Sequence, residues 1–179
     1  MYELNSFFQS LEIERNSVTN FFIVFSRFEY ALKRAGYIKS NSKNNYNAEP
    51  NWDSFVSKNK KSFQLLQKTD NDENNKLKEA IKYLRNFPPK KLVYKKVSNE
   101  DKNKELILED IPPNKSEIHY LLSVIKTARN NLFHGEKSPS YLKETARDME
   151  LLNSSIIILE AWLKLDKGVN SLFFEKIPY

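Results

Sequence analysis

The spacing of apolar positions along the chain predicts a protein built mainly from amphipathic helices. Over residues 17–35, apolar side chains recur every three or four positions, and Gly36 follows as a helix-ending residue. The same spacing predicts five further helices, over about 3–12, 53–68, 72–87, 114–134 and 141–166. The helix over 53–68 has a predicted break near 58–61. Pro88-Pro89 ends the third helix, and residues 114–117, which resemble a capping box, begin the fourth. We therefore expect an all-α fold, a bundle of four to five main helices.

Three stretches do not follow the helical pattern. Residues 37–51 are polar and rich in Asn, which indicates a long loop. Residues 88–113 lie between two Pro-Pro pairs and contain two short β-prone runs, so they form either a small hairpin or an irregular insertion. Residues 170–179 carry many aromatic side chains for a tail, and we expect them to dock on the bundle. The whole of 1–179 is then one helical domain with an inserted excursion.

Two charged residues fall within otherwise apolar helix faces. One such face consists of Ile118, Leu121, Leu122, Ile125, Ala128 and Leu132. Arg129 lies in the middle of it, and Glu29 lies in the middle of the apolar face of 17–35. A buried charge is costly unless it is paired and hydrogen-bonded. We therefore expect Glu29 and Arg129 to meet or to converge on one cleft, whether for catalysis or as a purely structural pair. His119 lies off the apolar face and is expected at the surface.

Composition narrows the classes of protein and of chemistry. Of 179 residues, 40% are hydrophobic and 29% are charged, which suits a globular domain. Cys is absent and His occurs twice, which excludes disulfides, Cys-ligated zinc, a thiol nucleophile and a His-rich metal site. We expect no metal and no cofactor. The chain lacks a long apolar run and a signal-like N-terminus, so we expect a cytoplasmic protein that does not enter a membrane. The net charge of +6 favours an anionic partner.

A short motif stands at the end of the predicted helix that contains Arg129. In Arg129-Asn130-Asn131-Leu132-Phe133-His134, an Arg and a polar residue are followed by three residues and a His, and Gly135 comes next. The motif resembles that of the HEPN superfamily. The stretch 25–37 around Glu29 also resembles the acidic first-helix region of that family. The resemblance covers roughly 15–36 and 114–167.

This resemblance implies an all-α homodimer in which two motifs face each other in a composite active site. Many members are metal-independent endoribonucleases, frequent in toxin and anti-phage systems, so an RNA substrate and a cognate antitoxin or defence partner are expected. By the same resemblance, Arg129 and His134 are catalytic and Asn130 positions them. Toxin relatives often have a Tyr two residues after the His, where this chain has Glu136. The alternative is a HEPN-like module that binds RNA, a nucleotide or a partner protein without catalysis.

These residue types suit RNA cleavage without a metal. Histidine, with an ordinary pKa of about 6.5, can take the proton of the 2′-hydroxyl that attacks the adjacent phosphorus. The Arg129 guanidinium stays charged and offers a planar fork of donors to the phosphoryl oxygens. Asn130 can donate to phosphate or orient the imidazole, and Glu29 can hold the guanidinium in place.

A cluster of basic and aromatic residues in the excursion favours an RNA-binding surface. The members of this cluster are Lys90, Lys91, Tyr94, Lys95 and Lys96. Lys126, in the helix that contains the motif, is a further predicted RNA-binding residue. The other interpretation of this cluster is a solvated charged face without a ligand.

Overall fold

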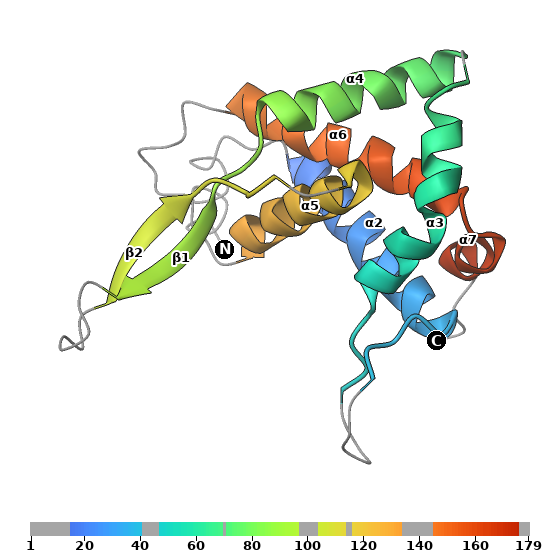
Figure 1. Cartoon of the computed structure of the whole chain (residues 1–179), viewed down its shortest axis with the longest axis horizontal. Coiled ribbons are helices and arrows are strands. Elements are labelled where there is room, and N and C mark those ends of the chain that lie inside the picture. Colours follow the sequence, from blue (N-terminus) through green and yellow to red (C-terminus); the bar gives the residue numbers. More distant parts are fainter. Residues whose placement is uncertain are drawn as a thin grey trace.

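The structure, a computed structural model, describes residues 15–40, 47–69, 71–96, 104–113, 116–133 and 145–175. Within these ranges the order of elements is α2 (Arg15–Arg34), α3 (Trp52–Leu66), α4 (Asp72–Asn86), β1 (Lys91–Lys96), β2 (Lys104–Glu109), α5 (Glu117–Phe133), α6 (Thr145–Leu163) and α7 (Lys167–Phe174). The predicted all-α class is confirmed, and the β1–β2 hairpin projects from the helical body (Figure 1). The helix predicted over 3–12 lies outside the described residues.

An aromatic core joins α2, α3 and α6. The apolar face of α2 buries Phe21, Phe25 and Phe28, as the helical spacing predicts. Trp52, the first residue of α3, stacks on Phe28 with ring centroids 4.9 Å apart, and Trp162 of α6 lies 6.4 Å from Trp52. Each such ring pair contributes about 0.5–1.5 kcal/mol beyond the area it buries. None of the helices in the described ranges is long and apolar enough to cross a membrane.

Gly36 ends α2, as the sequence predicts. Its φ of +86° lies in the left-handed region that favours glycine. The N–H of Tyr37 then donates to the carbonyl of Leu32 at 2.9 Å, and the N–H of Gly36 donates to that of Lys33 at 3.2 Å. This paired pattern is a Schellman cap, and it satisfies two carbonyls at the helix end.

The predicted break in the 53–68 helix is wrong, since α3 is continuous. Asn59, inside the predicted break, is buried and donates from Nδ2 to the carbonyl of Phe55 at 2.9 Å. The polar run therefore contains one position of the buried face, while Lys58, Lys60 and Lys61 stay exposed. The helix also begins earlier than predicted, because Oδ1 of Asn51 accepts the N–H of Ser54 at 3.0 Å and caps it.

The polar loop is confirmed for its described ends, 37–40 and 47–51, which run beside each other. Ile38 forms an antiparallel bridge with Pro50, and Lys39 forms an ion pair with Glu49 at 2.8 Å. Tyr37 nevertheless belongs to the core and packs edge-on against Phe55 at 5.5 Å. The sequence pattern missed it because a single apolar residue next to a helix end has no periodicity.

The excursion contains a regular hairpin rather than an irregular insertion. β1 and β2 are antiparallel, and their Cα register pairs Leu92 with Leu108, Val93 with Ile107 and Tyr94 with Leu106. The described part of the excursion beyond the strands is irregular.

The C-terminal part of the bundle departs from the prediction of one helix up to Asp166. α6 ends at Leu163, and Asp166 caps a separate helix, α7, by accepting the N–H groups of Gly168 and Val169 at 3.0 and 3.2 Å. Arg27 of α2 in turn binds the last carbonyls of α7, with Nε 2.6 Å from the oxygen of Phe173. Residues 170–175 thus pack on α2, whereas 176–179 lie outside the described residues.

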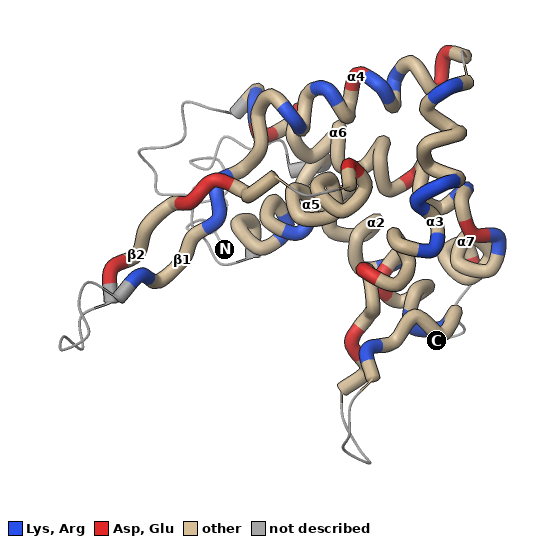
Figure 2. Tube along the Cα trace, in the orientation of Figure 1, with Lys and Arg blue, Asp and Glu red and all other residues tan. Residues whose placement is uncertain are grey.

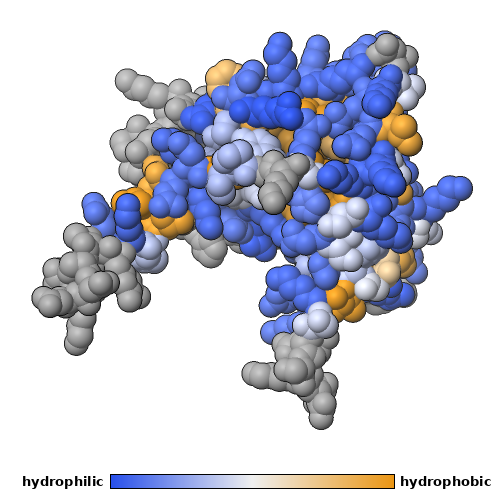
Figure 3. Space-filling view, viewed as in Figure 1, coloured by the Kyte–Doolittle hydropathy of each residue, from blue (hydrophilic) through white to orange (hydrophobic). Residues whose placement is uncertain are grey.

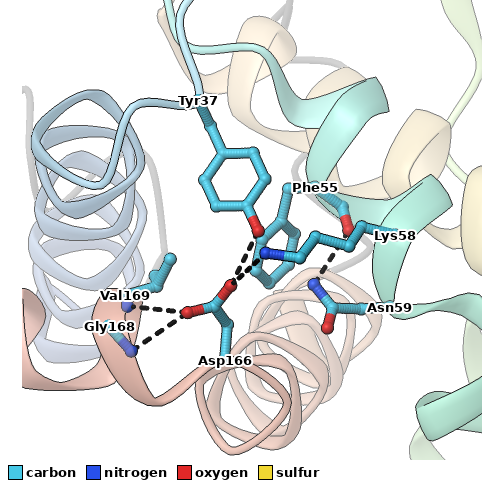
Figure 4. Close-up of polar contacts among 7 residues, drawn as sticks. All are labelled: Tyr37, Phe55, Lys58, Asn59, Asp166, Gly168 and Val169. Atoms are coloured by element: carbon cyan, nitrogen blue, oxygen red, sulfur yellow. Dashed lines mark hydrogen bonds and ion pairs between the residues drawn. The ribbon is translucent and has the colours of Figure 1, made fainter.

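Asp166 also links three segments that are far apart in the sequence (Figure 4). The hydroxyl of Tyr37 donates to its Oδ2 at 2.7 Å, and Nζ of Lys58 on α3 lies 3.6 Å from the same oxygen. Burial by itself raises the pKa of this carboxyl, but the hydrogen bonds from Tyr37 and Val169 and the charge of Lys58 outweigh that effect and lower it. We call Tyr37, Lys58 and Asp166 the latch.

Candidate active site

Arg129 lies near the C-terminal end of α5 and is partly buried. Its Nη1 donates to Oδ1 of Asn130 at 3.1 Å, and its guanidinium carbon lies 5.7 Å from the centroid of the Phe25 ring on α2. A guanidinium at this distance from an aromatic ring is attracted by the ring's π-system. The amide and the ring thus help to fix the orientation of the planar cation at the helix end.

Glu29 does not form the expected ion pair with Arg129. In the described part of the chain, Oε1 of Glu29 instead accepts a hydrogen bond from the indole Nε1 of Trp52 at 3.2 Å. Lys126, three residues before Arg129 on α5, is the lysine whose pKa the charge of Glu29 helps to raise, as the smallest of several influences. Arg129 itself contacts α2 at Phe25, one helical turn before Glu29.

Lys126 is a partly buried cation in a charged surrounding. Burial lowers the pKa of its ammonium group, and the positive charge of Lys39 acts in the same direction. The carboxylates of Asp53 and Glu29 act against this shift without cancelling it. Of the predicted site residues, Lys126 and Arg129 thus lie on α5 and Glu29 lies on α2, and Arg129 contacts α2 at Phe25.

His134, Gly135 and Glu136 lie outside the described residues, which reach Phe133 in this part of the chain. The structure therefore positions the Arg129-Asn130 half of the motif and no more of it. No protein-family model, curated protein or solved structure matches this chain.

Three of the predicted RNA-binding lysines stand opposite carboxylates. Lys91 pairs with Glu109 and Lys95 with Glu105 in the hairpin register, and Nζ of Lys90 lies 3.6 Å from Oδ1 of Asp110. Figure 2 shows the resulting alternation, with basic residues along β1 facing acidic residues along β2. The hairpin is therefore less basic than β1 alone, and the charge available to RNA at these positions is reduced.

The motif and the base of the hairpin are joined by a side chain that the sequence did not single out. Asn131, two residues after Arg129, donates from Nδ2 to the backbone carbonyl of Lys90 at 3.0 Å. β1 also contacts α5. The predicted catalytic helix end and the predicted RNA-binding segment are thus direct neighbours, although about 40 residues separate them in the sequence.

Two further contacts of the site escaped the sequence argument. Phe25 contacts Arg129 and Trp52 donates to Glu29, and the sequence pattern singled out neither aromatic residue for the site. His119 was expected at the surface but is half-buried, with Nε2 3.1 Å from Oγ of Ser57 on α3. The apolar spacing of one helix cannot reveal these contacts, because they depend on which side the neighbouring helices approach.

Proposed function

We propose that this protein is a HEPN-type, metal-independent endoribonuclease with Arg129 and His134 as its catalytic residues. One observation carries the proposal. A guanidinium near the end of a helix is held by Phe25 and Asn130, five residues before His134 in the sequence and beside the base of a lysine-containing hairpin. A held cation next to a titratable imidazole suits the stabilisation of a charged phosphoryl transition state.

The proposed reaction uses the RNA itself as nucleophile. His134 removes the proton of a 2′-hydroxyl, whose oxygen then forms a bond to the adjacent phosphorus. Arg129 neutralises the negative charge that develops on the phosphoryl oxygens. The bond from phosphorus to the 5′-oxygen breaks, and that oxygen takes up a proton. The products are a 2′,3′-cyclic phosphate and a 5′-hydroxyl end.

The proposal includes a homodimer with a composite active site, in a toxin or anti-phage setting with a cognate antitoxin or defence partner. Two copies would bring two Arg129 guanidiniums and two His134 imidazoles to one cleft. Such an arrangement supplies a second group that can donate the proton to the leaving oxygen. Sedimentation velocity of the full chain is the direct test of the dimer.

The alternative function is a HEPN-like module that binds RNA, a nucleotide or a partner protein without cleavage. Two observations favour it: Glu136 replaces the Tyr of many toxin relatives, and carboxylates stand opposite Lys90, Lys91 and Lys95. The first removes a side chain on which activity in toxin relatives can depend. The second reduces the attraction for RNA beside the motif, so among the three ligands it favours a partner protein.

Incubation of the purified full chain with total RNA in EDTA separates the two functions. We expect cleavage in chelator, products with 2′,3′-cyclic phosphate ends, and a loss of rate of about 10²–10⁴-fold in His134→Ala. His119→Gln is the matched control, since it changes the other histidine of the chain. Intact RNA with the parent protein, or equal cleavage by His134→Ala, would refute the proposed function.

A further inference from the structure

The hairpin has two chemically different faces, which the register makes explicit. Because successive strand positions alternate between faces, the pairs 91–109, 93–107 and 95–105 share one face. That face carries two Lys–Glu pairs around Val93 and Ile107. Opposite charges directly across a ribbon stabilise it and cancel each other's field. This face is therefore well suited to water.

The other face consists of the pairs 92–108, 94–106 and 96–104, and it has no carboxylate. Tyr94 is 69% exposed there, Leu106 51% and Leu108 47%. Figure 3 shows that apolar surface is present on the described part of the hairpin. The last register pair, nearest the hairpin tip, joins Lys96 to Lys104. We call this the Tyr94 face. It carries an exposed aromatic ring among leucine side chains, and lysines occupy both positions of its outermost register pair.

We infer that the Tyr94 face binds unpaired RNA, with the Tyr94 ring as a stacking platform for a base and the 96–104 lysine pair beside the backbone phosphates. The inference rests on the proposed function for its choice of ligand. Its independent support is charge complementarity, since the register positions of this face include Lys96 and Lys104 and no carboxylate, whereas those of the opposite face match each lysine with a glutamate. Base stacking on an exposed aromatic ring within a cationic surface is how single-stranded nucleic acids are commonly held.

The position of this face relative to the motif gives it a role. The bond from Asn131 to the carbonyl of Lys90 anchors the hairpin to the end of α5, two residues after Arg129. An RNA strand on the Tyr94 face therefore leads from the hairpin toward the proposed cleavage site. The roles of the lysines differ from the sequence-based expectation: Lys96 and Lys104 contribute, whereas Lys91 and Lys95 belong to the neutral face.

The test measures binding by the fluorescence anisotropy of a labelled RNA, used once as a single strand and once in a duplex. The protein is the full chain with His134→Ala, so that the probe stays intact. Tyr94→Ala should weaken single-strand binding by about 5- to 150-fold, the range that base stacking supports. Tyr94→Phe keeps the ring and should bind within about twofold of its parent. Lys104→Ala should lower affinity and flatten the salt dependence, and Lys95→Ala, on the neutral face, should do neither.

The outcomes also separate this inference from the proposed function. Unchanged affinity in Tyr94→Ala, or equal losses in Tyr94→Ala and Tyr94→Phe, would overturn the inference even if the parent chain cleaves RNA. Unchanged RNA affinity together with a lower sedimentation coefficient in Tyr94→Ala would identify the face as a protein contact and would overturn it as well. A Tyr94-dependent affinity in a parent chain that cleaves no RNA would support the inference and refute the proposed nuclease.

Discussion

The partner of Glu29 shows how far residue-scale chemistry depends on small offsets between helices. Glu29 and Arg129 each carry a charge on a core-facing side, and the sequence predicts that they meet or converge on one cleft. The structure instead gives Glu29 the indole N–H of Trp52 and the field of Lys126, and gives Arg129 the ring of Phe25. Arg129 contacts α2 at Phe25, one helical turn before Glu29, and so does not pair with the Glu29 carboxylate. The proposed catalytic role of Arg129 can thus be tested separately from the role of Glu29.

A double-mutant cycle measures this separation. Glu29→Gln combined with Lys126→Met should show a coupling energy of about 0.5 kcal/mol or more, because the two groups interact in a partly buried site. Glu29→Gln combined with Arg129→Met should be additive within about 0.5 kcal/mol. The free energies come from urea unfolding of the singles and doubles. A larger coupling with Arg129 than with Lys126 would contradict the geometry.

At the scale of single elements, helix ends fix where the chain turns toward the site. Gly36 ends α2, which carries Phe25 and Glu29, and directs the chain through Tyr37 into the core. A Cβ at Gly36 would meet no atom within 4 Å, so nothing opposes a side chain there except the backbone conformation itself. The position thus isolates the cost of a left-handed residue from any steric clash.

Gly36→Ala should lower the free energy of unfolding by about 1–2 kcal/mol, the cost of an ordinary residue in the left-handed region. Gly36→Asn should cost less, because Asn tolerates this conformation better than Ala does. Thermal or urea unfolding of both variants gives the comparison. Equal losses in Ala and Asn would show that the backbone conformation does not dominate at this position.

At the scale of the whole molecule, the latch joins the end of α2, the middle of α3 and the start of α7 (Figure 4). One carboxylate performs two functions there. Its Oδ1 caps α7, and its Oδ2 accepts from Tyr37 and lies near Lys58. Together with Arg27, which binds carbonyls at the other end of α7, it holds the short helix against α2. The orientation of the C-terminal segment is thus set by tertiary contacts.

Asp166→Ala should cost about 2–3 kcal/mol, since it removes both a helix cap and a hydrogen bond. Asp166→Asn retains capping capacity and should cost less. The pKa of Asp166 is lowered in the folded state from its ordinary 3.8. The ionised carboxylate therefore adds stability above that value, and this stability is lost as pH falls through the lowered pKa.

The measurement is unfolding free energy as a function of pH for the parent, Asp166→Ala and Asp166→Asn. Both variants should lose less stability than the parent on the acid side, because neither has the titrating group. If the free energy of unfolding fell equally with pH in the parent and in Asp166→Asn, the ionised Asp166 carboxylate would not be stabilised by its contacts.

Much of this protein is determined locally by its sequence. The helical spacing of apolar residues predicted the all-α class and most helix positions, Gly36 predicted the end of α2, and two β-prone runs marked the strands. The described part of the motif, 129–133, lies in the last turns of α5, the helix in which it was expected. These features depend on residues within a few positions of each other, so the sequence pattern contains the necessary information.

Tertiary structure alone decided which distant groups meet. The partner of Glu29, the Asn131 bond to the hairpin, the burial of Tyr37 and the separate helix α7 each depend on contacts between elements. The division of the basic cluster into a neutral face and the Tyr94 face depends on strand register, where a shift of one residue would exchange the faces. Periodicity fixes which side of an element is apolar. The rotation and offset of packed elements fix which polar groups come within reach, and those are properties of the packed core.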